Sequence, residues 1–317
     1  MRSIEPCPNL LLIGGPKSGT TSLLLWLRKH EEIYHPWQRL GSGAWESGFL
    51  LGGIVDNPYE PSKPKGTLIL PHEADMDYYI NEPLIIDKSP QHLYSRRALE
   101  TVRDFMPEAK VIITIRDPVD LFISLYHQME KTGYFSTPFD ELVELLDDQE
   151  WIADADIPET WSFLTYPRFS SFVKSWVEQL GEHRVRVVPL PAIAKDARGV
   201  LNELSDWLGI EQEKMPVDLS KKNPRGKLSN SPLRRFLREP PDWAFTAAHL
   251  LLPSRSLRKA LLDPIRSKGW KYVPSDKQPI SDDLRSKMAS MFAEDIEFFQ
   301  SVENHIPQSV VVNPSSD

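Results

Sequence analysis

The fold class is decided by the stretch Leu10–Leu27, which reads LLLIGGPKSGTTSLLLWL. An apolar run leads into a turn that contains three glycines, and a leucine-rich segment follows the turn. A short apolar strand followed by a glycine-containing turn and a helix is typical of a parallel α/β sheet, where ligands bind beyond the carboxyl ends of the strands. The stretch therefore predicts an α/β fold with a ligand-binding turn at one edge of its sheet.

The turn departs from an ATP-binding loop in one respect. Loops that bind ATP or GTP read G-x-x-x-x-G-K-[ST], and here Gly14 and Gly19 have that spacing while Thr21 occupies the Ser/Thr position. Thr20 stands where the lysine is expected, and the lysine of the turn, Lys17, comes earlier. The N–H groups and the dipole at the start of the following helix still favour an anion. We therefore expect a phosphate-bearing ligand other than ATP.

Composition places the chain among ordinary globular proteins. Of the 317 residues, 40% are hydrophobic and 26% are charged, and the net charge is -8. This acidic balance argues against a nucleic-acid partner. The single cysteine, Cys7, excludes an intrachain disulfide and argues against a cysteine-based metal site. No signal-peptide pattern and no apolar run of about 18 residues is found, so we expect a cytoplasmic protein without a membrane span.

Short apolar runs alternate with amphipathic segments along the chain. The expected strands are Leu10–Ile13, Leu84–Ile86, Val111–Ile115 and Val185–Val188, and the expected helices are Thr20–His30, Ser95–Phe105, Val119–Lys131 and Phe169–Leu180. Strands that alternate with helices indicate βαβ units. We therefore predict an α/β, P-loop-type, three-layer fold whose central parallel sheet is flanked by helices, within a single domain over residues 1–317.

Two segments break this alternation. Residues 35–81 are rich in glycine, proline and aromatic residues, and we expect a loop-rich excursion with short helices over the acceptor side of the cleft. Residues 210–305 are expected to be mainly helical.

Polar residues end two further apolar runs. Asp87 follows the second run and Arg116 follows the third. The carboxyl ends of parallel strands meet at one edge of a sheet, so these side chains are expected near the glycine turn. Asp117 suits the N-cap of the next helix and Pro118 its first position. Arg116 and Ser124, two turns into that helix, could together hold a second phosphate, or Arg116 could pair with Asp87 or Asp117.

These segments resemble motifs of sulfotransferases that use 3′-phosphoadenosine-5′-phosphosulfate (PAPS). PKSGTTSLLLWL (16–27) is similar to their 5′-phosphosulfate loop, and KVIITIRDPVDLFISLYHQ (110–128) is similar to their 3′-phosphate segment. IIDKSPQHLY (85–94) resembles the EK[ST]PxYF strand of the heparan-sulfate-type and related bacterial enzymes, with Asp87 in place of the catalytic Glu. SKGWKYVP (267–274) resembles the loop that closes over the nucleotide in the same branch.

The resemblance implies a role for each motif residue. Lys17 would contact the oxygen that bridges phosphate and sulfate and would stabilise charge as the sulfuryl group leaves. The 5′-phosphate would be held by Ser18, Gly19, Thr20, Thr21 and Ser22. The 3′-phosphate would be held by Arg116 and Ser124 and covered by Lys268, Gly269 and Lys271, with Arg225, Gly226 and Lys227 as the competing cover. No metal is expected, because a sulfuryl group carries less charge than a terminal phosphate and the eight histidines show no metal-ligand spacing.

The attacking hydroxyl needs a general base, and the sequence offers three. Asp87 occupies the position of the family's Glu, although its side chain is one methylene shorter. His92 lies five residues further on, and His127 lies in the helix after Arg116. Asp87 is the first choice, and the other two remain open.

We therefore predict transfer of a sulfuryl group from PAPS to a hydroxyl, or as second choice an amine, of a small molecule or carbohydrate, with adenosine 3′,5′-bisphosphate (PAP) as product. The transfer would be an in-line displacement. A nucleotide-dependent kinase with a degenerate loop is one rival, disfavoured by the displaced lysine and the absence of clear magnesium ligands. A non-catalytic nucleotide-binding regulator is the other, kept open by the replacement of Glu by Asp87. The sequence does not indicate an oligomeric state.

Overall fold

The computed structural model describes residues 7–36, 50, 53–54, 68–69, 79–132, 137–146, 165–219, 227–228, 272–273 and 280–304. The chain divides into two units, one of residues 1–220 and 280–317, the other of residues 221–279. In the second unit the described residues are the antiparallel strands β8 (Lys227–Leu228) and β9 (Tyr272–Val273). The single-domain prediction, with its helical segment 210–305, stays a prediction.

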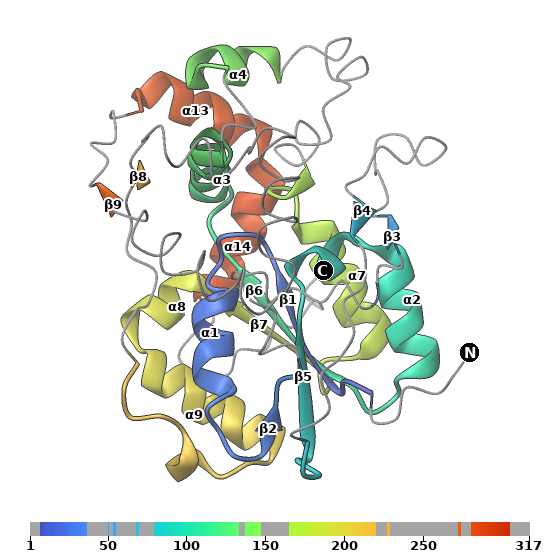
Figure 1. Cartoon of the computed structure of the whole chain (residues 1–317). Coiled ribbons are helices and arrows are strands. Elements are labelled where there is room, and N and C mark those ends of the chain that lie inside the picture. The colour runs from blue at the N-terminus through green and yellow to red at the C-terminus, as the bar shows by residue number, and fades with distance from the viewer. Residues whose placement is uncertain are drawn as a thin grey trace, which may run out of the picture. The chain divides into compact units, whose positions relative to one another are not determined.

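A five-stranded parallel sheet forms the centre of the first unit (Figure 1). Across the sheet the strands are β2 (Ile33–Tyr34), β5 (Leu84–Lys88), β1 (Leu10–Gly14), β6 (Lys110–Ile115) and β7 (Val185–Pro189). The predicted α/β class and parallel sheet are therefore confirmed. The edge strand β2 was not predicted, because two residues are too short to stand out as an apolar run.

Both faces of the sheet are covered by helices, which explains why its strands are apolar throughout. Every residue of β1 is buried. Leu10 and Leu12 pack in a cluster with residues of α1 (Thr20–Leu27), α8 (Leu190–Lys195) and α9 (Ala197–Leu208). Leu11 and Ile13 pack in a second cluster on the opposite face, with residues of α2 (Arg96–Phe105), α3 (Pro118–Thr132), α4 (Phe139–Leu145), α7 (Ser170–Leu180), α13 (Asp282–Met291) and α14 (Ala293–Asn304).

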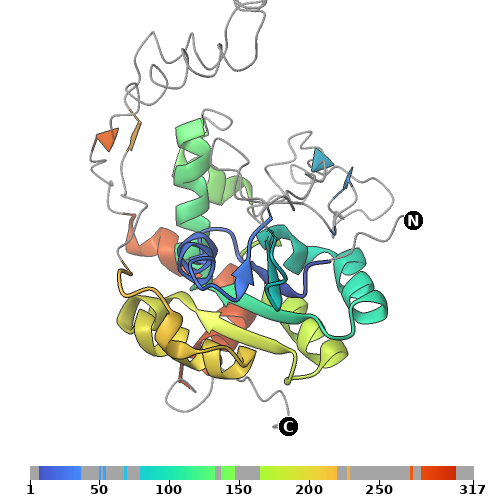
Figure 2. The same ribbon diagram turned by 60° about the horizontal axis from the view of Figure 1, so that its bottom comes forward.

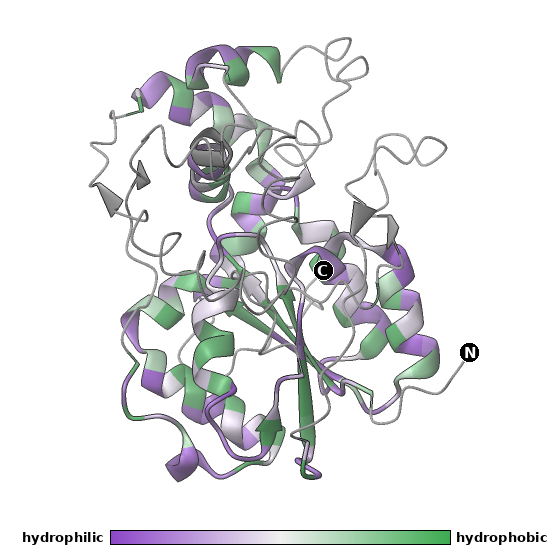
Figure 3. Cartoon of the chain, viewed as in Figure 1, coloured by the Kyte–Doolittle hydropathy of each residue, from purple (hydrophilic) through white to green (hydrophobic). Residues whose placement is uncertain are grey.

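The figures show the same division. Helices α8 and α9 lie side by side below the sheet in Figure 2. The strands are coloured mainly as hydrophobic in Figure 3, whereas the helices carry both hydrophobic and hydrophilic residues. Two short 3₁₀ helices, η1 (Pro90–Tyr94) and η2 (Gln212–Lys214), follow β5 and α9.

Element boundaries differ from the sequence prediction at two places that matter for the site. Strand β5 continues through Asp87 and Lys88, which are in register with Leu11 and Leu12, instead of ending before them. Helix α1 ends at Leu27, because the chain tightens into a turn in which the His30 N–H bonds to the Leu27 carbonyl oxygen.

The segment 35–81 contains an element that the sequence did not predict. Strand β3 (Gly53–Ile54) pairs antiparallel with β4 (Leu68–Ile69), where we expected loops and short helices. Leu50 is buried in the core. Most other residues of this segment, and with them the expected short helices, lie outside the described residues.

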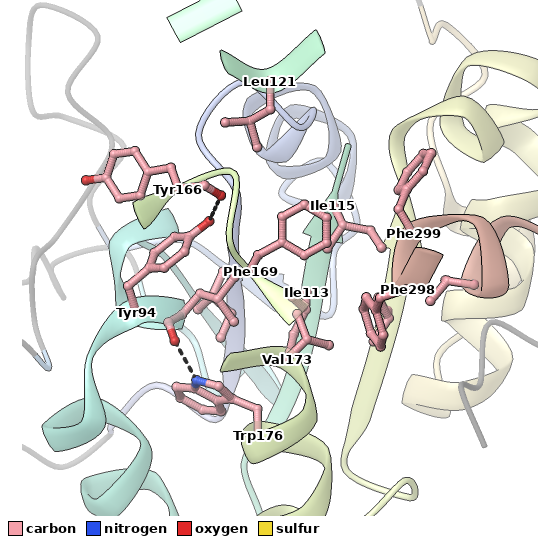
Figure 4. Packing of buried hydrophobic residues seen from close by; sticks show 14 of the residues in the cluster. Tyr94, Ile113, Ile115, Leu121, Tyr166, Phe169, Val173, Trp176, Phe298 and Phe299 are labelled. Atoms are coloured by element: carbon pink, nitrogen blue, oxygen red, sulfur yellow. Dashed lines mark hydrogen bonds between the residues drawn. The ribbon is translucent and has the colours of Figure 1, made fainter. Parts of the chain in front are cut away.

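Two hydrogen bonds fix η1, one to α7 and one to the segment just before it (Figure 4). The indole nitrogen of Trp176 donates to the Leu93 carbonyl oxygen at 2.9 Å, and the Tyr94 hydroxyl donates to the Tyr166 carbonyl oxygen at 2.9 Å. Burial raises the pKa of the Tyr94 hydroxyl well above its usual value, so that it remains a donor. Because η1 directly follows β5, these bonds hold the polar residues at the end of that strand in place.

A buried carboxylate joins the last helix to α7. Asp295 on α14 is 5% exposed, and its Oδ1 accepts the Ser170 N–H, at the first residue of α7, at 2.7 Å. Burial raises the pKa of this carboxyl, although the hydrogen bonds from Ser170 act in the opposite direction. The carboxylate therefore satisfies one of the free N–H groups at the start of α7 at the cost of its own hydration.

We predict that Asp295→Ala lowers the free energy of unfolding by about 1–3 kcal/mol, because it leaves the buried Ser170 N–H without an acceptor. Asp295→Asn keeps an acceptor oxygen and should cost less. The raised pKa means that the contribution of Asp295 to stability is full below the ordinary aspartate pKa and declines as the pH rises through the folded-state pKa. Urea unfolding across a pH series should show this decline in the wild type. The same decline in Asp295→Asn would contradict the assignment.

Candidate active site

The glycine turn begins at Gly14, the last residue of β1, which lies opposite Thr114 on β6. Gly14 has φ 138°, and a side chain there would lie 2.7 Å from both the backbone nitrogen and the hydroxyl oxygen of Thr114 on β6. The next N–H, that of Gly15, donates to the Thr114 carbonyl oxygen at 2.9 Å. Only glycine fits this approach, since it has no Cβ and tolerates positive φ. The contact sends the chain out of the sheet and into the turn.

The turn leads into α1, whose N-terminus has no side-chain cap. Gly19, with φ 96°, occupies the N-cap of α1, no side chain caps the helix, and its first turn holds no acidic residue. The first-turn residues are Thr20, Thr21 and Ser22, of which Thr20 is buried and the other two are half-buried. The N–H groups of a first helical turn have no partner within the helix, so this end of α1 favours an anion.

Two residues inside the turn add to this tendency. Lys17 is exposed and adopts φ 68°, which is unusual for a residue with a side chain. Ser18 is fully buried, and its hydroxyl has no hydrogen-bond partner among the described residues. Most buried hydroxyls are satisfied, and a ligand or an ordered water in the turn would satisfy this one. A methyl group on Gly15 would lie 2.7 Å from the Ser18 Oγ, which shows how closely the turn is folded around that oxygen.

Two of the three candidate bases lie together. Asp87 on β5 and His92 in η1 are fully buried, and His92 Nδ1 is 3.2 Å from Asp87 Oδ2. His92 Nε2 accepts the Leu50 N–H at 3.3 Å. Nε2 is thus the nitrogen of the ring that accepts a hydrogen bond, and Nδ1 is the nitrogen beside Asp87. The third candidate, His127, lies on α3 beside Tyr126, half-buried.

A further histidine, to which the sequence analysis gave no role, belongs to this group. His35 follows β2, the neighbour of β5 in the sheet, and is fully buried. Burial, reinforced by Arg28 and Lys88 and opposed by Asp87, lowers the pKa of its imidazole from 6.5 to about 4. Lys88 is itself only 4% exposed. The sequence feature that could have indicated His35 is the change from the apolar Ile33 to polar residues at the end of β2.

Arg116 follows β6 as predicted, but its partner is neither of the two expected. Its Nη2 donates to Asp120 Oδ2 at 3.4 Å, instead of bonding to Asp87 or Asp117. The spacing of four residues places Arg116 and Asp120 on one side of the helix start, and this spacing was the overlooked signal in the sequence. Ser124, expected to act with Arg116, lies one turn beyond Asp120 on α3 and is half-buried.

The predicted capping of α3 is confirmed. Asp117 Oδ1 accepts the Asp120 N–H at 2.9 Å, and Pro118 is the first residue of the helix.

Only one of the residues proposed to cover the 3′-phosphate is among the described residues. Lys227 begins β8 in the second unit, whereas the remaining members lie outside the described residues: Arg225, Gly226, Lys268, Gly269 and Lys271.

The described residues contain no group of three or more His, Cys, Asp or Glu side chains arranged to hold a metal ion. Within the same ranges, no helix is long and apolar enough to cross a membrane.

We predict that His35 makes the fold acid-sensitive. Its folded-state pKa of about 4 lies below the ordinary value of 6.5. The contribution of neutral His35 to the free energy of unfolding is therefore fully retained above about pH 6.5. It is lost as the pH falls toward 4, to the extent of about 3 kcal/mol. In His35→Gln this loss should disappear from urea unfolding curves recorded over that pH range. His183→Gln, at an exposed histidine, is the matched control, and an unchanged acid slope in His35→Gln would refute the prediction.

Comparison with known proteins connects this site to one family. The sequence model of the Sulfotransferase family matches residues 68–214. Human heparan sulfate glucosamine 3-O-sulfotransferase 6 is 23% identical over 205 residues, which cover 65% of this chain and 53% of that protein. Mouse bifunctional heparan sulfate N-deacetylase/N-sulfotransferase 4 is 24% identical over 217 residues, which cover 66% of this chain and 23% of that protein. The matched part thus spans about half the length, or less, of these curated relatives.

The fold is shared with a solved structure over nearly the whole chain. The crystal structure of a sulfotransferase from Alicyclobacillus acidocaldarius superposes with a TM-score of 0.58 at 18% identity, covering 94% of this chain and 96% of that one. At this level of identity the likeness concerns the fold. The chain is thus similar to sulfotransferases in the matched segment 68–214 and to the curated relatives in sequence, and it shares the fold of a sulfotransferase.

Proposed function

We propose that the chain transfers a sulfuryl group from PAPS to a hydroxyl group, or as second choice an amine, of a carbohydrate or small molecule. The observation that carries the proposal is the glycine turn, where the buried, unpartnered Ser18 hydroxyl and the uncapped start of α1 meet. Both features suit the phosphate of a nucleotide. Lys17 supplies a cation within the turn, at a place where ATP-binding loops have none.

The proposed binding roles follow the two anion sites. At the first, the 5′-phosphate is held by Lys17, Ser18, Gly19, Thr20, Thr21 and Ser22. At the second, Arg116 and Ser124 hold the 3′-phosphate. The parallel register supports one continuous nucleotide site, because β1 and β6 are neighbours and both anion sites follow their carboxyl ends. Lys268, Gly269 and Lys271 remain the proposed cover.

The proposed reaction is an in-line displacement at sulfur. The acceptor oxygen forms a bond to sulfur while the bond between sulfur and the bridging oxygen of the 5′-phosphosulfate breaks. Lys17 stabilises the negative charge that grows on the leaving phosphate, and PAP is the product. As in phosphoryl transfer, the contribution of the protein is mainly positioning and charge stabilisation.

We propose Asp87 as the base that takes the proton from the acceptor hydroxyl. His92 is less suited to that role, because its Nε2 accepts the Leu50 N–H and its Nδ1 faces Asp87. Its Nδ1 lies 3.2 Å from the carboxylate, and we propose that the ring orients the carboxylate, as a third group orients the base in other acid–base sites. His92 is therefore proposed as a positioning residue. His127 remains the third candidate.

The names of the curated relatives favour a sugar acceptor, because they describe enzymes that act on heparan sulfate glucosamine. The net charge of -8 favours an uncharged or lightly charged sugar over a highly sulfated chain. A mass-spectrometric screen with labelled PAPS and a pool of small alcohols and oligosaccharides would identify the acceptor. A cytoplasmic location remains part of the proposal.

Calorimetry tests the proposed function against its rivals. The chain should bind PAP tightly without magnesium, whereas preference for magnesium-ATP would favour a kinase. PAP binding without transfer to any acceptor would favour a regulator.

In Lys17→Ala we expect transfer to fall at least about 100-fold, as for the removal of one donor to a developing anion. Lys29→Ala, at an exposed lysine beyond the end of α1, is the control, and full activity in Lys17→Ala would refute the role of Lys17.

Substitutions at Asp87 and His92 should separate the base from its orienting partner. Asp87→Asn removes the base and should lower kcat about 100- to 10,000-fold at saturating PAPS. His92→Ala should lower kcat less, and His92→Asn, which restores an N–H donor near Nδ1, should recover part of the loss. The pH dependence of kcat should change in His92→Ala. An Asp87→Asn variant with nearly full activity, beside an inactive His92→Asn, would reverse the two roles.

A further inference from the structure

We propose that Arg285 is a second cation of the 3′-phosphate site, which offsets the charge of Asp120 so that Arg116 stays available to the phosphate. The inference rests on the proposed function, because the 3′-phosphate belongs to the co-substrate proposed there. It concerns a residue on α13, far along the chain from the motifs of the sequence analysis.

The geometry is a chain of three charges. Asp120 Oδ2 is 3.4 Å from Arg116 Nη2, and Asp120 Oδ1 is 3.6 Å from Arg285 Nη2. One carboxylate is thus shared by two guanidinium groups, one from the end of β6 and one from α13. The cluster keeps a net charge of +1 where a second phosphate is proposed to bind. Without Arg285 the remaining pair would be neutral, and Asp120 would repel a dianion at Arg116.

Both contacts are of the kind that a ligand can replace. They are longer than close charge-assisted hydrogen bonds, and each joins a single pair of atoms. Asp120 is 46% exposed and Arg285 is 49% exposed, so water screens the attraction. A phosphate can therefore replace Asp120 as the partner of Arg116, provided that another cation still neutralises the Asp120 carboxylate. Arg285 is that cation.

Arg285 also borders open space. It lines a hollow of about 270 Å³ with Asp117, Val119, Ser286, Ala289 and Ile296, between the start of α3 and helices α13 and α14. The glycine turn does not line this hollow. The guanidinium group therefore has room to follow Asp120 when Arg116 turns toward a ligand.

Helix α13 itself is firmly placed, so Arg285 is presented from a fixed backbone. Ser281 caps the helix, with its Oγ accepting the Leu284 N–H at 3.3 Å, and Met288 is buried in the core. Lys287, two residues from Arg285, pairs with Glu144 on α4 at 3.0 Å instead of with Asp120. Lys287 therefore provides a cation on the same helix with a different partner.

The test measures the affinity of the full chain for PAP and for adenosine 5′-monophosphate, which lacks the 3′-phosphate. Arg285→Gln should weaken PAP binding about 3- to 10-fold and change binding of the monophosphate less than about 2-fold. Arg285→Lys should stay near the wild type. Asp120→Asn should tighten PAP binding, and the double variant Arg285→Gln/Asp120→Asn should bind at least as well as the wild type. Lys287→Gln, the matched control, should leave both affinities unchanged.

The outcomes separate this inference from the proposed function. Wild-type chain that binds no PAP would overturn both. PAP binding that is the same in the wild type and in Arg285→Gln would overturn the inference alone. So would a double variant as weak as Arg285→Gln, because the effect of Arg285 would then not act through Asp120. Equal weakening of PAP and monophosphate binding would indicate a general structural effect and would likewise overturn it.

Discussion

The close approach of Gly14 to Thr114 is the constraint on which the site depends. Neighbouring strands carry side chains at every residue, yet here β6 leaves no room for one on β1. The missing side chain lets the Gly15 N–H reach the Thr114 carbonyl oxygen and turns the chain sharply toward α1. The turn then has the tightness that buries the Ser18 hydroxyl and leaves the start of α1 open. The proposed anion site at this edge thus depends on a packing condition inside the sheet.

The polar side chains that lie on β5, in η1 and after β2 are costly to bury, and the surrounding core holds them in place. Asp87, His92 and His35 are all fully buried, and burial of charge is costly unless partners compensate. Their backbone positions are set by the parallel register of β5 with β1 and β2, and by the Trp176 and Tyr94 hydrogen bonds that fix η1. Rigid support of this kind is what a base needs if its geometry is to exist before the ligand arrives.

The sheet was predictable because its central strands are buried on both faces and therefore read as continuous apolar runs, such as residues 10–13 and 111–115. Capping of α3 by Asp117 was predictable for a local reason, since N-caps involve neighbours in sequence. The partner of Arg116 was predictable from the four-residue spacing to Asp120 but was overlooked. The partner of Asp295 was not predictable, because Ser170 lies far from Asp295 in the chain. His35 was missed for a third reason: β2 is held by pairing with β5 and has too few residues for a periodic pattern.

The order of the strands also has a consequence for how the protein reaches its native state. Leu10 pairs with Ile86 on one side and with Lys110 on the other, so both neighbours of β1 come from much later in the chain. Pairings between distant segments require closure of long loops and slow the folding of a domain. During synthesis the glycine turn is made early, but the Thr114 contact that shapes it must wait for β6. The proposed nucleotide should therefore bind only to chains that have completed the sheet, and it would stabilise folded molecules without speeding their formation.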